Sequence, residues 1–147
     1  MLQRIQSLYL LVSAILVGFL FVLPFAEIAK DGAIYLFNCK GILLDGVLKE
    51  NGISISILIG VIMALHGFAV LSYKNRIRQI RVVVYSMLLL LGLFGMFFFF
   101  TYYSFSGALI SFKISMVFPL CAIILDYLAI RAIGKDEALI RSIDRIR

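Results

Sequence analysis

The chain has 147 residues, of which 63% are hydrophobic and 15% charged, and its mean hydropathy is +1.09. Soluble domains are only about half apolar, so the excess of apolar residues argues against a soluble domain and indicates contact with lipid. The formal net charge of +6 does not indicate nucleic-acid binding, because the basic residues stand in short clusters between apolar runs, as they do in proteins beside anionic lipid.

Four long apolar runs dominate the chain, over residues 7–25, 53–73, 82–103 and 112–133. A helix of roughly 20 residues crosses about 30 Å of hydrocarbon, and backbone groups in lipid must be satisfied within the helix itself. The sequence therefore predicts an all-α membrane protein, a single domain over 1–147 built as a bundle of four transmembrane helices. No clear cleavage site follows the first run, so we interpret it as a retained helix rather than a signal peptide.

Between the first two runs lies an outer loop, 26–52, which is predicted to hold a small β-hairpin that turns at Asp31 and Gly32. A short amphipathic piece over 41–52 is expected to follow it at the membrane interface. The cytoplasmic tail, 134–147, is predicted to bend at Gly134 and to form an amphipathic helix on the inner leaflet. The alternative for this tail is a docking site for a cytoplasmic partner.

The distribution of lysine and arginine predicts the orientation. Ten basic residues lie before the first run, between the second and third, or at and after the end of the fourth, against four elsewhere. This excess places both termini and the 73–81 link in the cytoplasm. The residues expected to contact anionic lipid headgroups there are Lys74, Arg76, Arg78, Arg81, Arg141, Arg145 and Arg147.

Small residues at helical spacing predict which helix faces pack inward. In the second run this stripe is Gly60, Ala64 and Gly67. In the fourth run the predicted inward face consists of Ser115, Pro119, Ala122, Asp126 and Ala129.

Asp126 is the most informative polar residue, because a carboxylate at membrane depth is costly and is usually paired or functional. His66 is expected at a similar depth, with Ser86 near it. One interpretation is a proton-responsive or ion-binding pair of Asp126 and His66. The other is a structural lock, in which Asp126 bonds to Ser86, Tyr85 or the backbone, or pairs with Arg131. We favour the lock, because His66 lies off the small-residue stripe of its helix.

No motif indicates catalysis, a metal site or a cofactor. Cys39 and Cys121 form neither a C-x-x-C pair nor a metal-ligand spacing, and one histidine cannot supply both axial ligands of a membrane haem. We therefore expect no enzymatic activity, no cofactor and no bound metal.

Three segments resemble a known family: the start MLQRIQSLYLL, the link YKNRIRQIR and the end FPLCAIILDYLAIRAIGKDEALIRSIDRIR. The chain is similar over essentially its whole length to a bacterial family of small four-helix membrane proteins, domain-of-unknown-function family 4293 (DUF4293). This resemblance implies a bacterial inner membrane. It transfers no catalytic residues, because the family has no established activity.

The favoured functional hypothesis is a structural or accessory subunit of a larger membrane protein complex, whose partners are other membrane subunits or a second copy of the chain, with no nucleic acid. The alternative is a small transporter or lipid-handling protein that uses Asp126. An enzyme ranks last.

Overall fold

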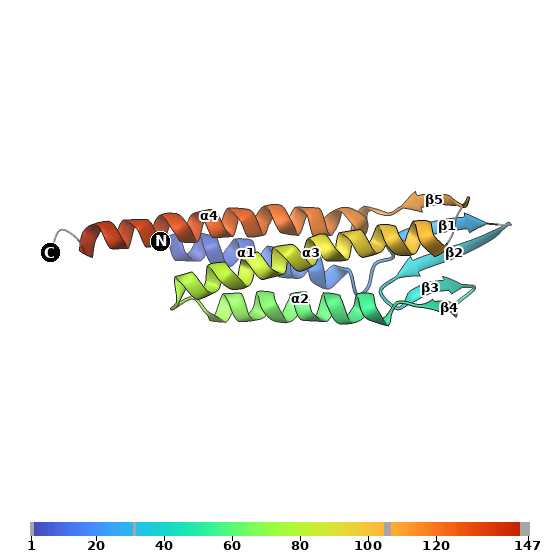
Figure 1. The fold of residues 1–147 in the computed structure, drawn as a ribbon, viewed down its shortest axis with the longest axis horizontal. Coiled ribbons are helices and arrows are strands. Elements are labelled where there is room, and N and C mark those ends of the chain that lie inside the picture. The colour runs from blue at the N-terminus through green and yellow to red at the C-terminus, as the bar shows by residue number, and fades with distance from the viewer. Residues whose placement is uncertain (1, 31, 105–106, 145–147) are drawn as a thin grey trace.

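The computed structural model describes residues 2–30, 32–104 and 107–144. Within them, four helices run side by side along one axis, and both ends of the chain lie at the same end of the molecule (Figure 1). Helix α1 packs against α2 and α4, and α3 packs against the same two helices. The helices are α1 (Leu2–Phe19), α2 (Ile53–Leu71), α3 (Arg76–Ser104) and α4 (Phe118–Asp144).

At the opposite end the described residues form an antiparallel sheet of five strands in the order β4-β3-β2-β1-β5. The all-α prediction is therefore wrong, and the outer segment is more than a single hairpin. The strands are β1 (Ala26–Lys30), β2 (Ala33–Asn38), β3 (Gly41–Leu44), β4 (Val47–Asn51) and β5 (Leu109–Phe112).

The residues at the turns explain most of the difference between the single predicted hairpin and the five-stranded sheet. The predicted β1–β2 hairpin is present, with Gly32 at φ +76°. A second hairpin, β3–β4, replaces the amphipathic piece expected over 41–52, and Asp45 and Gly46 both take positive φ at its tip. Asp-Gly is a strong signal for a two-residue hairpin turn. The short link before α4 supplies β5, which pairs with β1 far away in sequence.

Helix boundaries also differ from the apolar runs. Helix α1 ends at Phe19, because residues 20–22 form turns before Pro24 and the sheet. Helix α4 begins after a short 3-10 helix, η1 (Ile114–Val117), with Pro119 in its first turn, where proline is tolerated. It then continues through Gly134 to Asp144. The prediction of a separate amphipathic helix at the C-terminus is therefore wrong, since one glycine weakens a helix without ending it.

In the described chain, three helical segments are long and apolar enough to cross a membrane: Ile53–Leu71, Arg76–Tyr103 and Ile114–Leu139. The apolar part of α1, Ile5–Phe19, is shorter. The prediction of four transmembrane helices, the first of them over 7–25, is corrected accordingly, because the first apolar run leaves helical geometry six residues before it ends.

An aromatic core joins the sheet to the bundle. Phe25, Phe37 and Phe97 are fully buried, with ring centroids 4.3 Å apart for Phe25 and Phe97 and 5.2 Å apart for Phe25 and Phe37. Phe97 comes from α3 and Phe37 from β2, so the burial of these rings fixes the sheet on the end of the helices. Fully burying a side chain of this kind stabilises a fold by about 1.5–3 kcal/mol.

Candidate functional site

Each of the helices α1 to α4 places one polar side chain at the same point in the interior of the bundle. The four residues, called here the polar cluster, are Ser13 on α1, His66 on α2, Ser86 on α3 and Asp126 on α4. All are between 0% and 1% exposed. Each lies on the buried stripe of its helix; on α2 this stripe also holds Ile59, Ile62 and Ala69.

The centre of the polar cluster is a contact between His66 and Asp126. His66 Nε2 lies 3.0 Å from one carboxylate oxygen of Asp126 and 3.1 Å from the other. The other ring nitrogen, Nδ1, lies 2.9 Å from the carbonyl oxygen of Ile62, one helical turn back. A carbonyl only accepts, so Nδ1 carries a hydrogen. One further proton then lies between Nε2 and the carboxylate.

The two serines complete the cluster. Ser13 Oγ lies 2.9 Å from His66 Nε2 and 3.4 Å from the carbonyl oxygen of Ala122. Ser86 Oγ donates to the carbonyl oxygen of Val83 at 2.8 Å and lies 3.4 Å from Asp126 Oδ2, so its single hydrogen serves the backbone first. In the part of the chain that the structure describes, no buried side-chain nitrogen or oxygen lacks a hydrogen-bond partner.

The structure brings together three of the four predicted intramembrane candidates. Asp126, His66 and Ser86 meet, whereas Arg131 is exposed further along α4 and Tyr85 is exposed on α3. The sequence argument against the His66–Asp126 contact is wrong. Ala64 and Gly67 face outward, and a Cβ added to Gly60 or Gly67 would meet no atom within 4 Å.

The predicted inward face of the fourth apolar run is buried at every position, from Ser115 on η1 to Ala129 on α4. Sequence reasoning missed Ser13. Its signal was its spacing from Gln6, Leu10 and Val17, which are also buried and recur every three or four residues.

The cluster suits holding one proton or fixing the packing of the helices. Among the described residues, no group of three histidine, cysteine or carboxylate side chains is placed to hold a metal ion. Cys39 and Cys121 are both free thiols.

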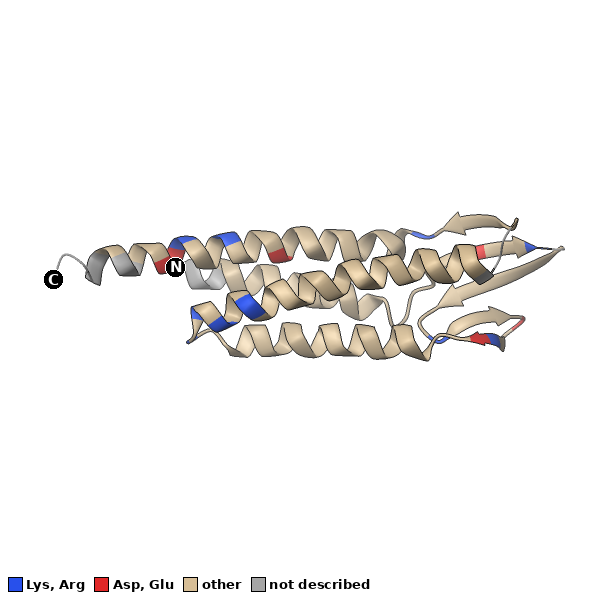
Figure 2. Ribbon diagram, in the orientation of Figure 1, with Lys and Arg blue, Asp and Glu red and all other residues tan. Residues whose placement is uncertain are grey.

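Basic residues gather at the end of the bundle that holds the 73–81 link (Figure 2). Lys74, Arg78 and Arg81 are exposed there, as headgroup contacts would need to be. Arg76 is different, because its guanidinium lies 2.9 Å from the Asp136 carboxylate and so ties the start of α3 to α4. The predicted contacts of the Arg141 side chain, Arg145 and Arg147 lie outside the described residues.

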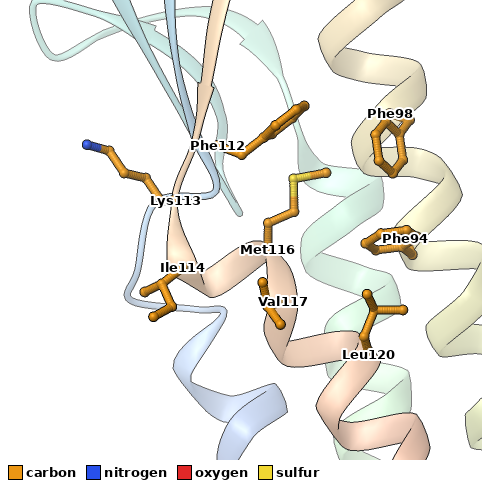
Figure 3. Close-up of a pocket in the computed structure, with 8 residues that line it drawn as sticks. All are labelled: Phe94, Phe98, Phe112, Lys113, Ile114, Met116, Val117 and Leu120. Atoms are coloured by element: carbon orange, nitrogen blue, oxygen red, sulfur yellow. The ribbon is translucent and has the colours of Figure 1, made fainter.

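The sheet end carries an ion pair, and two apolar grooves are lined by the lysine of this pair. Lys113 Nζ lies 2.8 Å from a carboxylate oxygen of Glu27. A groove of about 340 Å³ lies between α3 and α4 (Figure 3). Its lining consists of Phe94, Phe98, Phe112, Lys113, Ile114, Met116, Val117 and Leu120. A second recess of about 210 Å³ is lined by Leu23, Pro24, Lys113, Ile114 and Ser115.

A ring of apolar helices around an enclosed histidine–carboxylate contact, closed at one end by an antiparallel sheet, defines a helical-bundle protein with helices long enough to cross a membrane. The chain belongs to the DUF4293 family, described as a domain of unknown function, whose sequence profile matches residues 2–146. Searches of curated proteins and of solved structures found no match.

Proposed function

We propose that the chain is an integral protein of the bacterial inner membrane, with both termini in the cytoplasm and the sheet outside. The outward sides of the helices support this placement, since large apolar residues such as Ile57, Leu88 and Ile124 are exposed there. Soluble monomers rarely expose continuous apolar surface on this scale. The basic cluster at one end of the bundle, which includes the exposed Arg78 and Arg81, supports the orientation.

We further propose that the protein is an accessory subunit of a larger membrane protein complex. The observation that carries this proposal is an apolar surface on the sheet, which the proposed orientation places outside the membrane. On the open face of the sheet, Ile34 is 65% exposed and Leu109 is 80% exposed. A shallow groove of about 190 Å³ lies between them.

The pairing of the strands explains why these side chains share one face. Ala29 is opposite Ile34 on one side and opposite Leu109 on the other, so the three form a row across the sheet. Leu36 and Leu48 extend the apolar surface on the same face towards β4. Alternate residues such as Ile28 and Phe37 point to the opposite face and fill the core.

Water contacts this face in the isolated chain, so covering it with an apolar surface would be favourable by about 25 cal/mol per Å². The partner that fits is another membrane protein with an apolar surface just outside the lipid. That partner would sit beside the sheet and share the membrane with the helices.

Purification in mild detergent tests the proposal. The wild-type chain should be recovered with one identified membrane partner in fixed stoichiometry. Ile34→Arg should abolish this association, because it places a charge at one end of the apolar row and beside the groove.

Val47→Arg is the matched control, since Val47 is 62% exposed but belongs to the opposite face of the β3–β4 hairpin. Association should survive this substitution. Repeated recovery of the wild-type chain alone, or equal loss of the partner in both variants, contradicts the accessory role.

The alternative, a small transporter that uses Asp126, is favoured by one observation, namely the proton held between His66 and Asp126. Against it, none of the three grooves described above is lined by either residue. Proton or solute flux into liposomes that contain the protein, compared between wild type and Asp126→Asn, separates the two functions. Flux that disappears in the variant supports transport.

A further inference from the structure

The Glu27–Lys113 ion pair lies at the junction of the sheet and the helices. Glu27 is on β1, and Lys113 follows β5 directly, with its backbone N–H donating to the carbonyl oxygen of Phe25 at 2.9 Å. Both side chains are about 40% exposed, at 39% and 40%. The pair therefore offers an accessible cation and an accessible anion at 2.8 Å from each other.

An apolar recess adjoins this pair on the side of the helices. It is formed where α1 ends and η1 begins, between Leu23, Pro24 and Ile114, and the stem of Lys113 lines it as well. Figure 3 shows Lys113 and Ile114 projecting to the same side of the chain, away from Phe94 and Phe98. The charged pair and the recess thus form one continuous surface.

The length of the helices sets the depth of this surface. From Ile114 to Arg131 the helical segment is roughly 26 Å long at 1.5 Å per residue, close to the thickness of the hydrocarbon layer. With Arg131 at the cytoplasmic boundary, Lys113 lies at the outer boundary. Exposed Tyr102 and Tyr103 lie near the same end of α3, and tyrosines of this kind mark membrane interfaces.

We infer that the surface binds one phospholipid of the outer leaflet whose headgroup is zwitterionic and carries a primary ammonium, as in phosphatidylethanolamine. The phosphate accepts hydrogen bonds from Lys113 Nζ, and the lipid ammonium donates to the Glu27 carboxylate. The acyl chain occupies the recess beside Leu23 and Ile114. An isolated lysine would select anionic lipid, whereas a lysine paired with a glutamate matches a headgroup that carries both charges.

This inference rests on the proposed membrane placement and not on the accessory role. Reporter fusions test the placement separately, so that a failure of lipid binding leaves that result unaffected. Glu27 also lines the groove on the open face of the sheet, so lipid binding is measured on the purified chain without a partner protein.

The test places the full chain in bilayers that contain equal amounts of phosphatidylethanolamine, phosphatidylcholine and phosphatidylglycerol with identical acyl chains. After extraction in mild detergent, native mass spectrometry measures the lipid that remains bound. Phosphatidylethanolamine should be enriched over phosphatidylcholine, because a quaternary ammonium has no N–H to donate to Glu27. Lys113→Gln should lower the total amount of bound lipid about tenfold, the effect of one hydrogen bond to a charged group, because all three lipids carry the phosphate.

Glu27→Gln should remove the discrimination between the two zwitterionic lipids. Ile114→Trp should fill the recess and displace the lipid, whereas Leu71→Trp, at the same 77% exposure on the cytoplasmic end, should not.

Lys40→Gln, which changes an exposed outer lysine away from the recess, is the control for charge. Enrichment of phosphatidylglycerol, equal retention of all three lipids by the wild-type chain, or an unchanged amount of bound lipid in Lys113→Gln overturns the inference. Thermal unfolding of each variant verifies that it is folded.

Discussion

At the scale of single residues, the polar cluster determines what a substitution at Asp126 does. The carboxylate and His66 share one proton, and neither side chain reaches solvent. Removing one partner leaves the other buried without its main hydrogen bond, which is destabilising.

Asp126→Ala should therefore lower the free energy of unfolding by about 2 kcal/mol, which is less than the roughly 3–5 kcal/mol of a buried pair in a soluble protein, because polar contacts between helices in a membrane are weaker. Asp126→Asn should lower the free energy of unfolding by less than half as much, since the asparagine amide still donates a hydrogen bond to Nε2 of a neutral His66. Unfolding in mixed micelles measures both values.

The double variant that combines Asp126→Ala and His66→Ala should lose less free energy of unfolding than the sum of the two single losses, because both substitutions remove the same contact. Strict additivity would show that the two side chains do not interact in the folded protein.

At the scale of elements, the β3–β4 hairpin depends on close backbone contact with the start of α2. A Cβ on Gly41 would lie 2.0 Å from the carbonyl oxygen of Glu50, and Gly41 takes a φ of +126°. A Cβ on Gly52 would lie 2.6 Å from the Cα of Gly41. These positions tolerate no side chain without movement of the backbone.

Gly41→Ala should accordingly destabilise the fold by about 3 kcal/mol or more, through steric overlap and a backbone conformation that L-residues avoid. Gly60→Ala, in the middle of α2 with open space around it, should be neutral or stabilise by about 0.5–1 kcal/mol. Thermal unfolding compares them, and equal destabilisation would contradict the position of the hairpin.

The continuation of α4 past Gly134 is a second element-scale feature. A Cβ at Gly134 would meet nothing within 4 Å, and Arg76 holds Asp136 just beyond it. Gly134→Ala should therefore raise stability by about 0.5–1 kcal/mol and slow proteolysis of the tail. Faster proteolysis or a lower unfolding temperature in this variant would indicate that the chain bends at Gly134 instead.

At the scale of the whole molecule, the arrangement of the charges predicts the topology. Basic residues surround the end that carries both termini, and the sheet lies at the other end (Figures 1 and 2). A reporter that is active only in the cytoplasm should work after Asn75, and one that is active only outside should work after Gly46. Activity of the outer reporter after Asn75 would overturn the proposed orientation.

Local signals predicted some of this fold well. The apolar run that became α2 was placed to within two residues, because Gly52 and the polar Ser72–Lys74 segment interrupt hydropathy where the helix ends. The inward face of α4 followed from its small residues. The β1–β2 turn followed from Asp31 and Gly32. In each case the residues that carry the signal are neighbours in the sequence.

The sheet and the polar cluster could not be predicted from local signals of this kind. The pairing of β5 with β1 joins Leu109 to Ala29 across most of the chain, and a four-residue strand has no periodicity of its own. The spacing of Ser13 indicates that it is buried, but its contact with His66 is visible only in the tertiary structure. The choice between a histidine pair and an Arg131 pair for Asp126 depended on the rotation of each helix about its axis.

Composition by itself indicated that these helices suit an apolar environment, and the order of apolar and basic segments located the four long helices, though not their bounds, and the end of them that carries positive charge. The tertiary structure decided the sheet, the His66–Asp126 contact and the Glu27–Lys113 pair. The physical reason is that hydropathy and turn preference act over a few residues, whereas strand pairing and the burial of polar groups are settled by which distant side chains satisfy one another once the helices have packed.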